Sequence, residues 1–261
     1  MNQPQLDTRG PLTLPYSKTF FTNQKPGSLQ SAKEVVPLVV DLLHPSSVAD
    51  VGCGVGTWLS VFREHGIQDC LGIDGDYVDR DLLLFPKDKF LAHDLTRPIE
   101  TSARFDLVVS LEVGEHLPAS CAGTFVDSLT SLGPVVLFSA AIPHQGGTRH
   151  INEQWQEYWC DLFEQRGYAP VDYLRRRIWR NPRVVWFYAQ NTLLYVERTH
   201  LAANPRLLAE SERTNTSQIS IVHPRALTNF SLRSALSLCA SAAQNSFRRR
   251  LVRRQRRRRP A

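Results

Sequence analysis

The chain has 261 residues, of which 42% are hydrophobic, and this length and apolar content are enough for one α/β domain with a proper core. Its five cysteines are odd in number and include no C-x-x-C pair, which argues against a disulfide framework and a zinc cluster (Cys53, Cys70, Cys121, Cys160 and Cys239). Nine arginines between Arg248 and Arg259 account for the net charge of +6, so the remaining chain carries 6 − 9 = −3, and the charge alone does not indicate a nucleic-acid-binding protein.

Residues 1–27 contain four prolines and little periodicity, so we expect an irregular N-terminal lead-in. The first residues have no apolar core of signal-peptide length, and no run of 18 apolar residues occurs in the sequence. We therefore expect a cytoplasmic protein without a transmembrane segment. From Ser28 to Leu43 the apolar spacing predicts an amphipathic helix, although Pro37 interrupts it.

The segment from Val48 to Trp58, Val-Ala-Asp-Val-Gly-Cys-Gly-Val-Gly-Thr-Trp, predicts a buried strand, a glycine-rich turn and the start of a helix. Glycines at alternate positions permit positive φ and close backbone approach to a ligand (Gly52, Gly54 and Gly56). The dinucleotide fingerprint requires G-x-G-x-x-G/A, but Thr57 stands at its third small position, so an NAD-dependent oxidoreductase is the weaker alternative. Asp50 lies inside the strand, where its carboxylate suits a cationic group better than phosphates.

Strands and helices alternate after the turn, which predicts a parallel sheet with helices on both faces. The expected strands are Val48 to Val51, Cys70 to Asp74, Lys89 to Ala92, Asp106 to Ser110 and Val135 to Ser139. The expected helices are Trp58 to Glu64, Ala119 to Ser131 and Asn152 to Arg166. Two final strands, Tyr168 to Leu174 and Thr192 to Val196, flank an aromatic-rich insert.

Residues 201–261 are rich in Ser, Ala and Asn before the arginine run, so we expect a poorly ordered extension. The Arg-rich tail is either a solvated tail or a contact for an anionic partner, such as RNA or a membrane surface.

Carboxylates follow two of the predicted strands, at the sheet edge where such folds bind ligands. Asp74 ends the second strand about 20 residues after the glycine turn, where a carboxylate can accept both ribose hydroxyls, and Gly75 leaves room for an adenine ring. A helix-capping role for Asp74 is the alternative. Asp94 and Leu95 follow the third strand in Ala-His-Asp-Leu.

The ordered series of acidic and glycine residues resembles that of class I S-adenosylmethionine-dependent methyltransferases over roughly Ser28 to Arg198 (Asp50, Gly52, Gly54, Gly56, Asp74 and Asp94). The resemblance implies a methyltransferase domain over residues 28–200. It implies a Rossmann-like, doubly wound, mostly parallel seven-stranded sheet with one antiparallel strand near its end. It further implies S-adenosyl-L-methionine as cofactor, with the turn beside the methionine part and Asp94 and Leu95 beside the adenine.

The fourth strand leads into Val-Ser-Leu-Glu-Val-Gly-Glu-His-Leu-Pro, which brings Glu112, Glu115 and His116 to the same cleft. On a helical turn, residues at i, i+3 and i+4 share one face, so these side chains are predicted to converge. They could supply a general base, His116 supported by Glu115, or ligands for a hard cation.

This Glu-x-x-Glu-His arrangement is similar to that of ubiquinone-biosynthesis O-methyltransferases and small-RNA 3′-terminal 2′-O-methyltransferases. In the latter family a later histidine joins a divalent metal site. The similarity implies a site for a cation such as Mg²⁺ formed by Glu112, Glu115, His116 and His150, with His144 as a second candidate. The run His-Ile-Asn-Glu-Gln-Trp also resembles bacterial methyltransferases associated with glycan or cell-envelope pathways.

We therefore expect O-methylation of a hydroxyl on a small molecule, a glycan or a lipid-linked precursor. An RNA 2′-O-methyltransferase is the alternative enzyme, because of the Arg-rich tail and the four candidate metal ligands. A non-catalytic S-adenosylmethionine-binding module is the alternative of another class.

Overall fold

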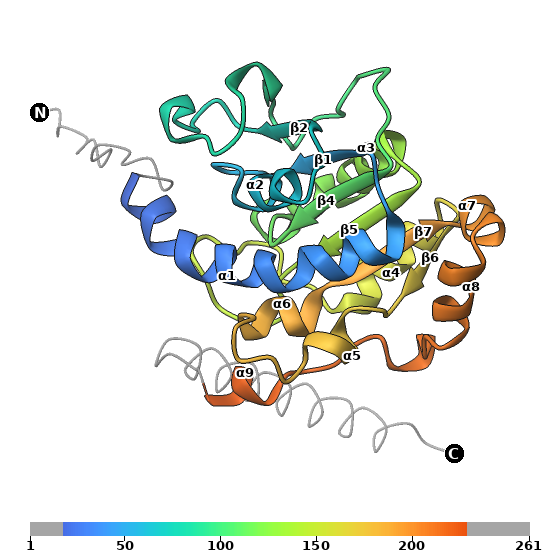
Figure 1. Cartoon of the computed structure of the whole chain (residues 1–261). Coiled ribbons are helices and arrows are strands. Elements are labelled where there is room, and N and C mark those ends of the chain that lie inside the picture. Colours follow the sequence, from blue (N-terminus) through green and yellow to red (C-terminus); the bar gives the residue numbers. More distant parts are fainter. Residues whose placement is uncertain (1–17, 229–261) are drawn as a thin grey trace, which may run out of the picture.

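The computed structural model describes residues 18–228, which form one seven-stranded sheet between two layers of helices (Figure 1). The strand order is β3-β2-β1-β4-β5-β7-β6. Neighbouring strands are parallel except where β7 pairs antiparallel with β5 and β6. The strands are β1 Ser47–Val51, β2 Asp69–Asp74, β3 Phe90–Ala92, β4 Leu107–Leu111, β5 Val135–Ser139, β6 Tyr168–Val171 and β7 Leu193–Glu197.

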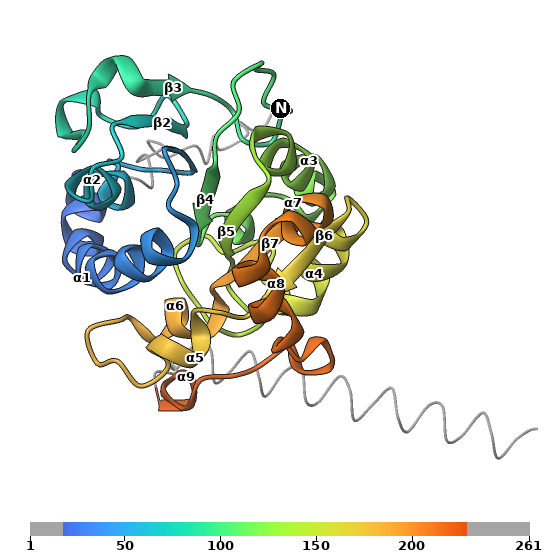
Figure 2. The ribbon, with the colours of Figure 1, turned by 45° about the vertical axis from the view of Figure 1, so that its right-hand side comes forward.

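Two apolar cores lie on the two faces of this sheet. Successive side chains of a strand point to opposite faces, so Leu107 and Val109 of β4 join one core and Val108 joins the other. The first core contains residues of α1 Lys18–Leu43 and α2 Thr57–Glu64, and the second contains residues of α3 Ala122–Leu132 and α4 Gln156–Glu164. Figure 2 shows α1 and α2 on one side of the sheet and α3 and α4 on the other.

The predicted Rossmann-like fold is confirmed, including the antiparallel strand near the end of the chain order. Strands β4 and β5 are buried along their whole length, which explains their uninterrupted apolar sequences. The largest differences in length from the predicted elements are at β6 and α4. Strand β6 ends at Val171, where the chain turns towards α5 Arg175–Ile178, and α4 begins only at Gln156, after a non-helical segment whose Asn152 and Gln154 N–H groups donate to Glu115 O and Ala141 O.

The expectation of an irregular segment through residue 27 is wrong from Lys18 onward, where α1 begins. Helix α1 continues through Pro37 to Leu43, and its buried residues include Val35, Val36 and Val39. Burial of this apolar stripe against the sheet compensates for the helix hydrogen bond that proline removes. Residues 1–17 lie outside the described residues.

The expectation of a poorly ordered extension is wrong for residues 201–228. This segment forms α8 Pro205–Glu212 and α9 Pro224–Thr228, after α7 Arg198–Ala203, and it packs on the domain. Leu207 and Ile219 are buried in the two cores, and the Gln156 side chain donates to Ile221 O at 3.1 Å. These few apolar anchors are spaced too irregularly for a pattern in the sequence to reveal them.

The Arg-rich tail falls in residues 229–261, outside the described residues. Within residues 18–228, none of the helices has both the length and the apolar character needed to cross a membrane.

Candidate active site at the carboxyl ends of the strands

A cavity of about 300 Å³ opens at the carboxyl ends of β1, β2 and β4. Several residues predicted for the site line it, namely Gly52, Gly54, Asp74, Gly75, Asp94, Leu95, Glu112 and His116. Asp50, Gly56, Glu115 and His150 do not belong to this lining. The parallel strand order brings these chain segments together, since β2, β1 and β4 are neighbours in the sheet.

The glycine turn takes a backbone that other residues would strain. Gly52 and Gly56 have φ values of 84° and 80°, in the left-handed region. A Cβ on Gly52 would lie 2.3 Å from the Val113 side chain, and one on Gly56 would lie 2.1 Å from the Phe85 ring. Gly56 also precedes the first turn of α2 as its N-cap residue. The predicted strand, turn and helix are therefore present. Gly56 starts the helix and does not line the cavity.

Asp50 is a buried carboxylate on β1, 3% exposed, and its Oδ2 has no hydrogen-bond partner in the described part of the chain. Burial, and then repulsion from Asp74, raises the pKa of Asp50 to about 8. A buried carboxyl with an unused oxygen gains most from a cation or a hydrogen-bond donor supplied by a ligand.

Asp74 holds the glycine turn in place. Its Oδ2 accepts from Gly54 N at 2.7 Å, and its Oδ1 accepts from Gly75 N at 2.7 Å and from the Tyr77 hydroxyl. Burial raises the pKa of Asp74 despite these hydrogen bonds, which oppose the shift. The phenol of Tyr77 therefore occupies an acceptor position that was predicted to serve ribose hydroxyls. Tyr77 was not among the residues predicted for the site, although its spacing of three residues from Asp74 was a signal for it.

Asp94 and Leu95 line the cavity just after β3, which is the strand next to β2 in the sheet. Leu95 is buried, whereas the Asp94 side chain is 56% exposed. Asp94 Oδ1 accepts from the backbone N–H of Thr96 at 3.0 Å and from its hydroxyl at 2.7 Å. These two bonds leave Asp94 Oδ2 on the solvent side, 3.5 Å from Arg97 Nε.

Glu112, Glu115 and His116 do not all meet at one point, although Glu112 and His116 line the same cavity. Glu112 directly follows β4 with a φ of 57°, and only Gly114–His116 form a 3₁₀ turn. This backbone conformation directs the Glu112 carboxylate towards two side-chain amides. It accepts from the side-chain amides of Gln145 at 2.7 Å and Asn191 at 3.2 Å, so Glu112 is not part of the candidate metal group.

Glu115, His116 and His150 do come together. Each offers one ligand atom, and these atoms lie within 4.8 Å of one another. Glu115 is fully buried, neither carboxylate oxygen has a hydrogen-bond partner among the described residues, and its Oε1 lies 3.9 Å from His150 Nε2. Burial, and then repulsion from Glu112, raises the pKa of Glu115 well above its usual value. This carboxyl needs a cation or a proton.

The two imidazoles of this group meet edge to face, with ring centroids 4.9 Å apart. Burial, and then repulsion from His150, lowers the pKa of His116 to about 4, so His116 is neutral at neutral pH. A neutral imidazole has a lone pair for a proton or a metal ion.

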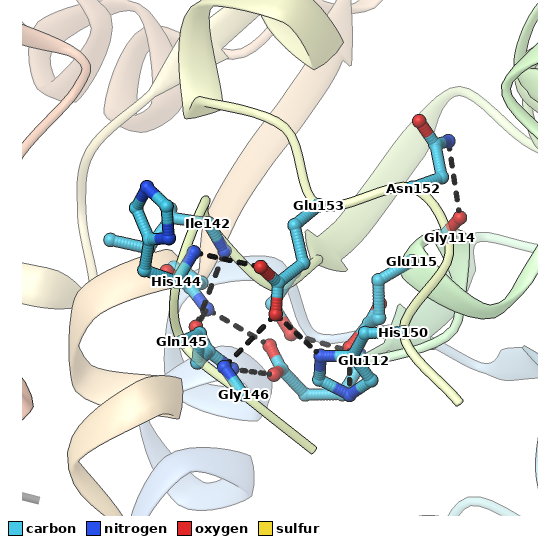
Figure 3. A network of polar contacts seen from close by, with 12 residues as sticks. Glu112, Gly114, Glu115, Ile142, His144, Gln145, Gly146, His150, Asn152 and Glu153 are labelled. Atoms are coloured by element: carbon cyan, nitrogen blue, oxygen red, sulfur yellow. Dashed lines mark hydrogen bonds and ion pairs between the residues drawn. The ribbon is translucent and has the colours of Figure 1, made fainter. Parts of the chain in front are cut away.

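Glu153 orients His150 and was not identified from the sequence as a site residue. Its Oε1 lies 3.1 Å from His150 Nδ1, and its carboxylate also accepts from the backbone N–H groups of His144 and Gly146 (Figure 3). Burial opposes ionisation of Glu153, but the hydrogen bonds from His150 and these N–H groups lower its pKa. With Nδ1 beside Glu153, the His150 ring turns its Nε2 towards Glu115. His144, the second histidine candidate, contributes its backbone and not its ring.

The aromatic-rich insert contributes one side chain to the cavity. Tyr188, on α6 Trp186–Asn191, lines it and shares a hydrogen bond of 3.2 Å with Ser28 of α1. Burial raises the pKa of Tyr188. Helices α1 and α6 thus close one side of the cavity.

Comparisons with known proteins show which family the chain is similar to. Residues 23–180 match the model of a family described as a methyltransferase domain. Solved structures with a similar fold include Streptomyces venezuelae DesVI, with 17% identity, a TM-score of 0.50 and coverage of 68% of this chain and 95% of the other. The methyltransferase domain of bacterial CtHen1 has 20% identity and a TM-score of 0.45, with coverage of 64% and 97%.

A third similar structure is the magnesium protoporphyrin IX methyltransferase of Synechocystis PCC 6803, which contains bound S-adenosylmethionine. It has 20% identity and a TM-score of 0.46, with coverage of 72% of this chain and 86% of the other. No curated protein matches the chain.

Proposed function

Because the chain belongs to the methyltransferase-domain family, in which class I members use S-adenosylmethionine, we propose that it methylates a hydroxyl group. The acceptor is a small molecule, a glycan or a lipid-linked precursor. One observation carries the choice of a hydroxyl. His116 lines the cavity next to the glycine turn, and it also belongs to the group with Glu115 and His150.

A hydroxyl needs the help that such a group can give. Methyl transfer from a sulfonium is an in-line displacement that needs an electron-rich nucleophile, and an alcohol is protonated at neutral pH. His116 stays neutral there, but its pKa of about 4 makes it a weak base. This weakness favours a role for His116 as a ligand or a positioning group over proton removal on its own.

The residues present suit a divalent cation. Glu115 is a fully buried carboxyl, and His116 and His150 add two imidazoles whose ligand atoms lie within 4.8 Å of it. When bound, such a cation would act as a Lewis acid that makes an acceptor hydroxyl more acidic. Two imidazoles and one carboxylate are more typical of a transition metal than of Mg²⁺, so Mn²⁺ is the better probe.

The cofactor would occupy the glycine-turn side of the cavity. Gly52 and Gly54 allow close backbone approach, and Asp74 has the position for the ribose once Tyr77 moves aside. Asp94 and Leu95 flank the position expected for the adenine, and Asp50 is the nearby carboxyl that a cationic methionine part would stabilise.

Calorimetry with S-adenosylmethionine, followed by a methyl-transfer screen with and without chelator, tests this function. The expected result is cofactor binding and transfer to hydroxylated compounds that falls when the chelator is added. Transfer to amines alone would contradict O-methylation, and transfer to RNA alone would support the alternative 2′-O-methyltransferase. Cofactor binding without transfer to any acceptor would support the non-catalytic binding module.

A further inference from the structure

A second cavity, of about 420 Å³, lies beside α5 and is rich in arginine. Four of its seven lining residues are arginines and only one is acidic (Asp172, Arg175, Arg176, Arg177, Trp179, Arg180 and Ile221). No role was predicted for the Arg-Arg-Arg-Ile-Trp-Arg run of residues 175–180, and the candidate active site does not use it. We call it the arginine pocket.

The arginine pocket is at the same sheet edge as the candidate active site. Both β6 and β5 run antiparallel to β7, so β6 is parallel to β5 and its carboxyl end lies at the edge where β1 and β4 end. The lining residues Asp172 to Arg180 come directly after β6. Figures 1 and 2 show α5 and α6 side by side, and α6 carries Tyr188 of the first cavity.

A continuous series of hydrogen bonds joins the two cavities. The ring Nε2 of His223 is 2.9 Å from Trp179 O, and the backbone N–H of His223 donates to Gln190 Oε1 at 2.8 Å. The Gln190 amide donates to Asn191 Oδ1 at 2.8 Å, and the Asn191 amide donates to Glu112 at 3.2 Å. Trp179 lines the arginine pocket and Glu112 lines the first cavity, so this buried network fixes the two cavities relative to each other.

Arg175 is the buried residue of the arginine pocket, and hydrogen bonds hold its side chain in place. It is 2% exposed, and it donates to Ile219 O and to Asp172 Oδ2, each at 2.7 Å. Its Nε is buried and has no hydrogen-bond partner in the described part of the chain. A buried guanidinium with an unused donor is costly unless an acceptor meets it.

The remaining positive charge is only partly balanced. Arg176, Arg177 and Arg213 share one carboxylate, Glu210, whose pKa they lower although burial opposes the shift. Arg180 is exposed, and its side chain makes no hydrogen bond or ion pair with any residue from 18 to 228. The pocket thus presents more guanidinium groups than its carboxylates can neutralise.

We propose that the arginine pocket binds a phosphate-bearing part of the methyl acceptor. Several guanidinium groups around one cavity suit an anion with more than one charge and with oxygens pointing in several directions, which is a phosphate or diphosphate more than a single carboxylate. The cavity has room for the group that carries the phosphate. This proposal rests on the proposed function, because it identifies the acceptor as a phosphorylated compound.

Direct binding of pyrophosphate, measured by calorimetry on the full chain, tests the pocket separately from methyl transfer. Arg180→Gln is expected to weaken pyrophosphate binding about tenfold, the effect of losing one charged hydrogen bond. Arg183→Gln is the matched control, because Arg183 is an exposed arginine of the same segment that pairs with Glu34 and does not line the pocket. Equal affinity in all three proteins, or no binding, would overturn the proposal.

Two further measurements separate the pocket from the proposed function. S-adenosylmethionine should bind all three proteins equally, and its failure to bind the wild type would contradict the proposed function and leave the pyrophosphate result to decide the pocket. In a transfer screen, sugar phosphates should be methylated in preference to the matching unphosphorylated sugars, and Arg180→Gln should raise KM for the phosphates alone. Equal methylation of both sets would overturn the assignment of the acceptor.

Discussion

His150 Nε2 lies 3.9 Å from the buried Oε1 of Glu115, and these two residues come from the loops that follow β5 and β4. The two side chains face each other in the interior of the site. Glu115 is fully buried and is stabilised by a positive charge or a proton, and Glu153 orients His150 so that its Nε2 faces this carboxyl.

Glu153→Gln should weaken metal binding and slow methyl transfer. An amide accepts the His150 Nδ1 proton less strongly than a carboxylate, so the ring loses its fixed orientation, and affinity for Mn²⁺ should fall by about 10- to 100-fold. Calorimetric titration with Mn²⁺ and the metal dependence of kcat measure the effect. Glu157→Gln, at an exposed position on the following helix, is the control, and equal Mn²⁺ affinity in both variants would refute the role of Glu153.

Asp50→Asn should change stability in a pH-dependent way. The pKa of Asp50 is raised from 3.8 to about 8 in the folded protein, so the folded state binds the additional proton between these values. The contribution of this carboxyl to the free energy of unfolding is therefore fully present below pH 3.8, and it is lost as the pH rises towards 8. Asn stays neutral, so the variant should gain stability relative to the wild type at pH 8 and gain little at pH 4.

Thermal unfolding at these two pH values, together with calorimetry for S-adenosylmethionine, measures the Asp50→Asn prediction. Cofactor affinity should fall, because the amide cannot balance a cationic ligand group. Asp88→Asn, at an exposed carboxylate, should change neither property. A stability difference that is the same at pH 4 and pH 8 would show that the Asp50 carboxyl does not titrate as described.

Tyr77→Phe should preserve or tighten cofactor binding, whereas Asp74→Ala should abolish most of it. The Tyr77 hydroxyl donates to the Asp74 oxygen that a ribose hydroxyl would use, so its removal frees an acceptor. Asp74→Ala removes the acceptor itself and releases the N–H groups of Gly54 and Gly75. Binding constants for S-adenosylmethionine decide the matter, and a strong loss in Tyr77→Phe would mean that the phenol contacts the cofactor.

Gly52→Ala should destabilise the protein by about 2 to 5 kcal/mol. The left-handed backbone costs an alanine about 1–2 kcal/mol, and its Cβ would lie 2.3 Å from Val113, an overpacking contact of about 1–3 kcal/mol. Denaturant unfolding measures this change. Adding Val113→Ala should remove the contact but not the backbone strain. Lack of any interaction between the two substitutions would show that the clash relaxes by another route.

Ile219→Ala should destabilise the protein by about 2–5 kcal/mol, because Ile219 is 1% exposed in the core beside α3 and α4. Ile221→Ala, at a partly exposed position two residues further on, should have a much smaller effect. Chemical denaturation of both variants measures the difference. Two equally neutral substitutions would mean that burial of the Ile219 side chain adds nothing to domain stability.

The local patterns in the sequence were enough to predict the sheet and the glycine turn. Continuous apolar strands and the spacing of Gly52, Gly54 and Gly56 are properties of neighbouring residues, and they identified most strand boundaries to within one residue. Asp74 and His116 were also predicted correctly as cavity residues, since the carboxyl ends of adjacent parallel strands meet at one edge.

The tertiary structure alone determined which side chains meet. With a positive φ, Glu112 places its carboxylate against the side-chain amides of Gln145 and Asn191 and outside the group of candidate ligand atoms, and a helical spacing rule cannot anticipate a single left-handed residue. The orientation of His150 by Glu153, the packing of Ile219 and the gathering of arginines after β6 depend likewise on contacts between distant segments. A sequence pattern records the local backbone preference of each segment, and long-range contacts follow only from how those segments pack.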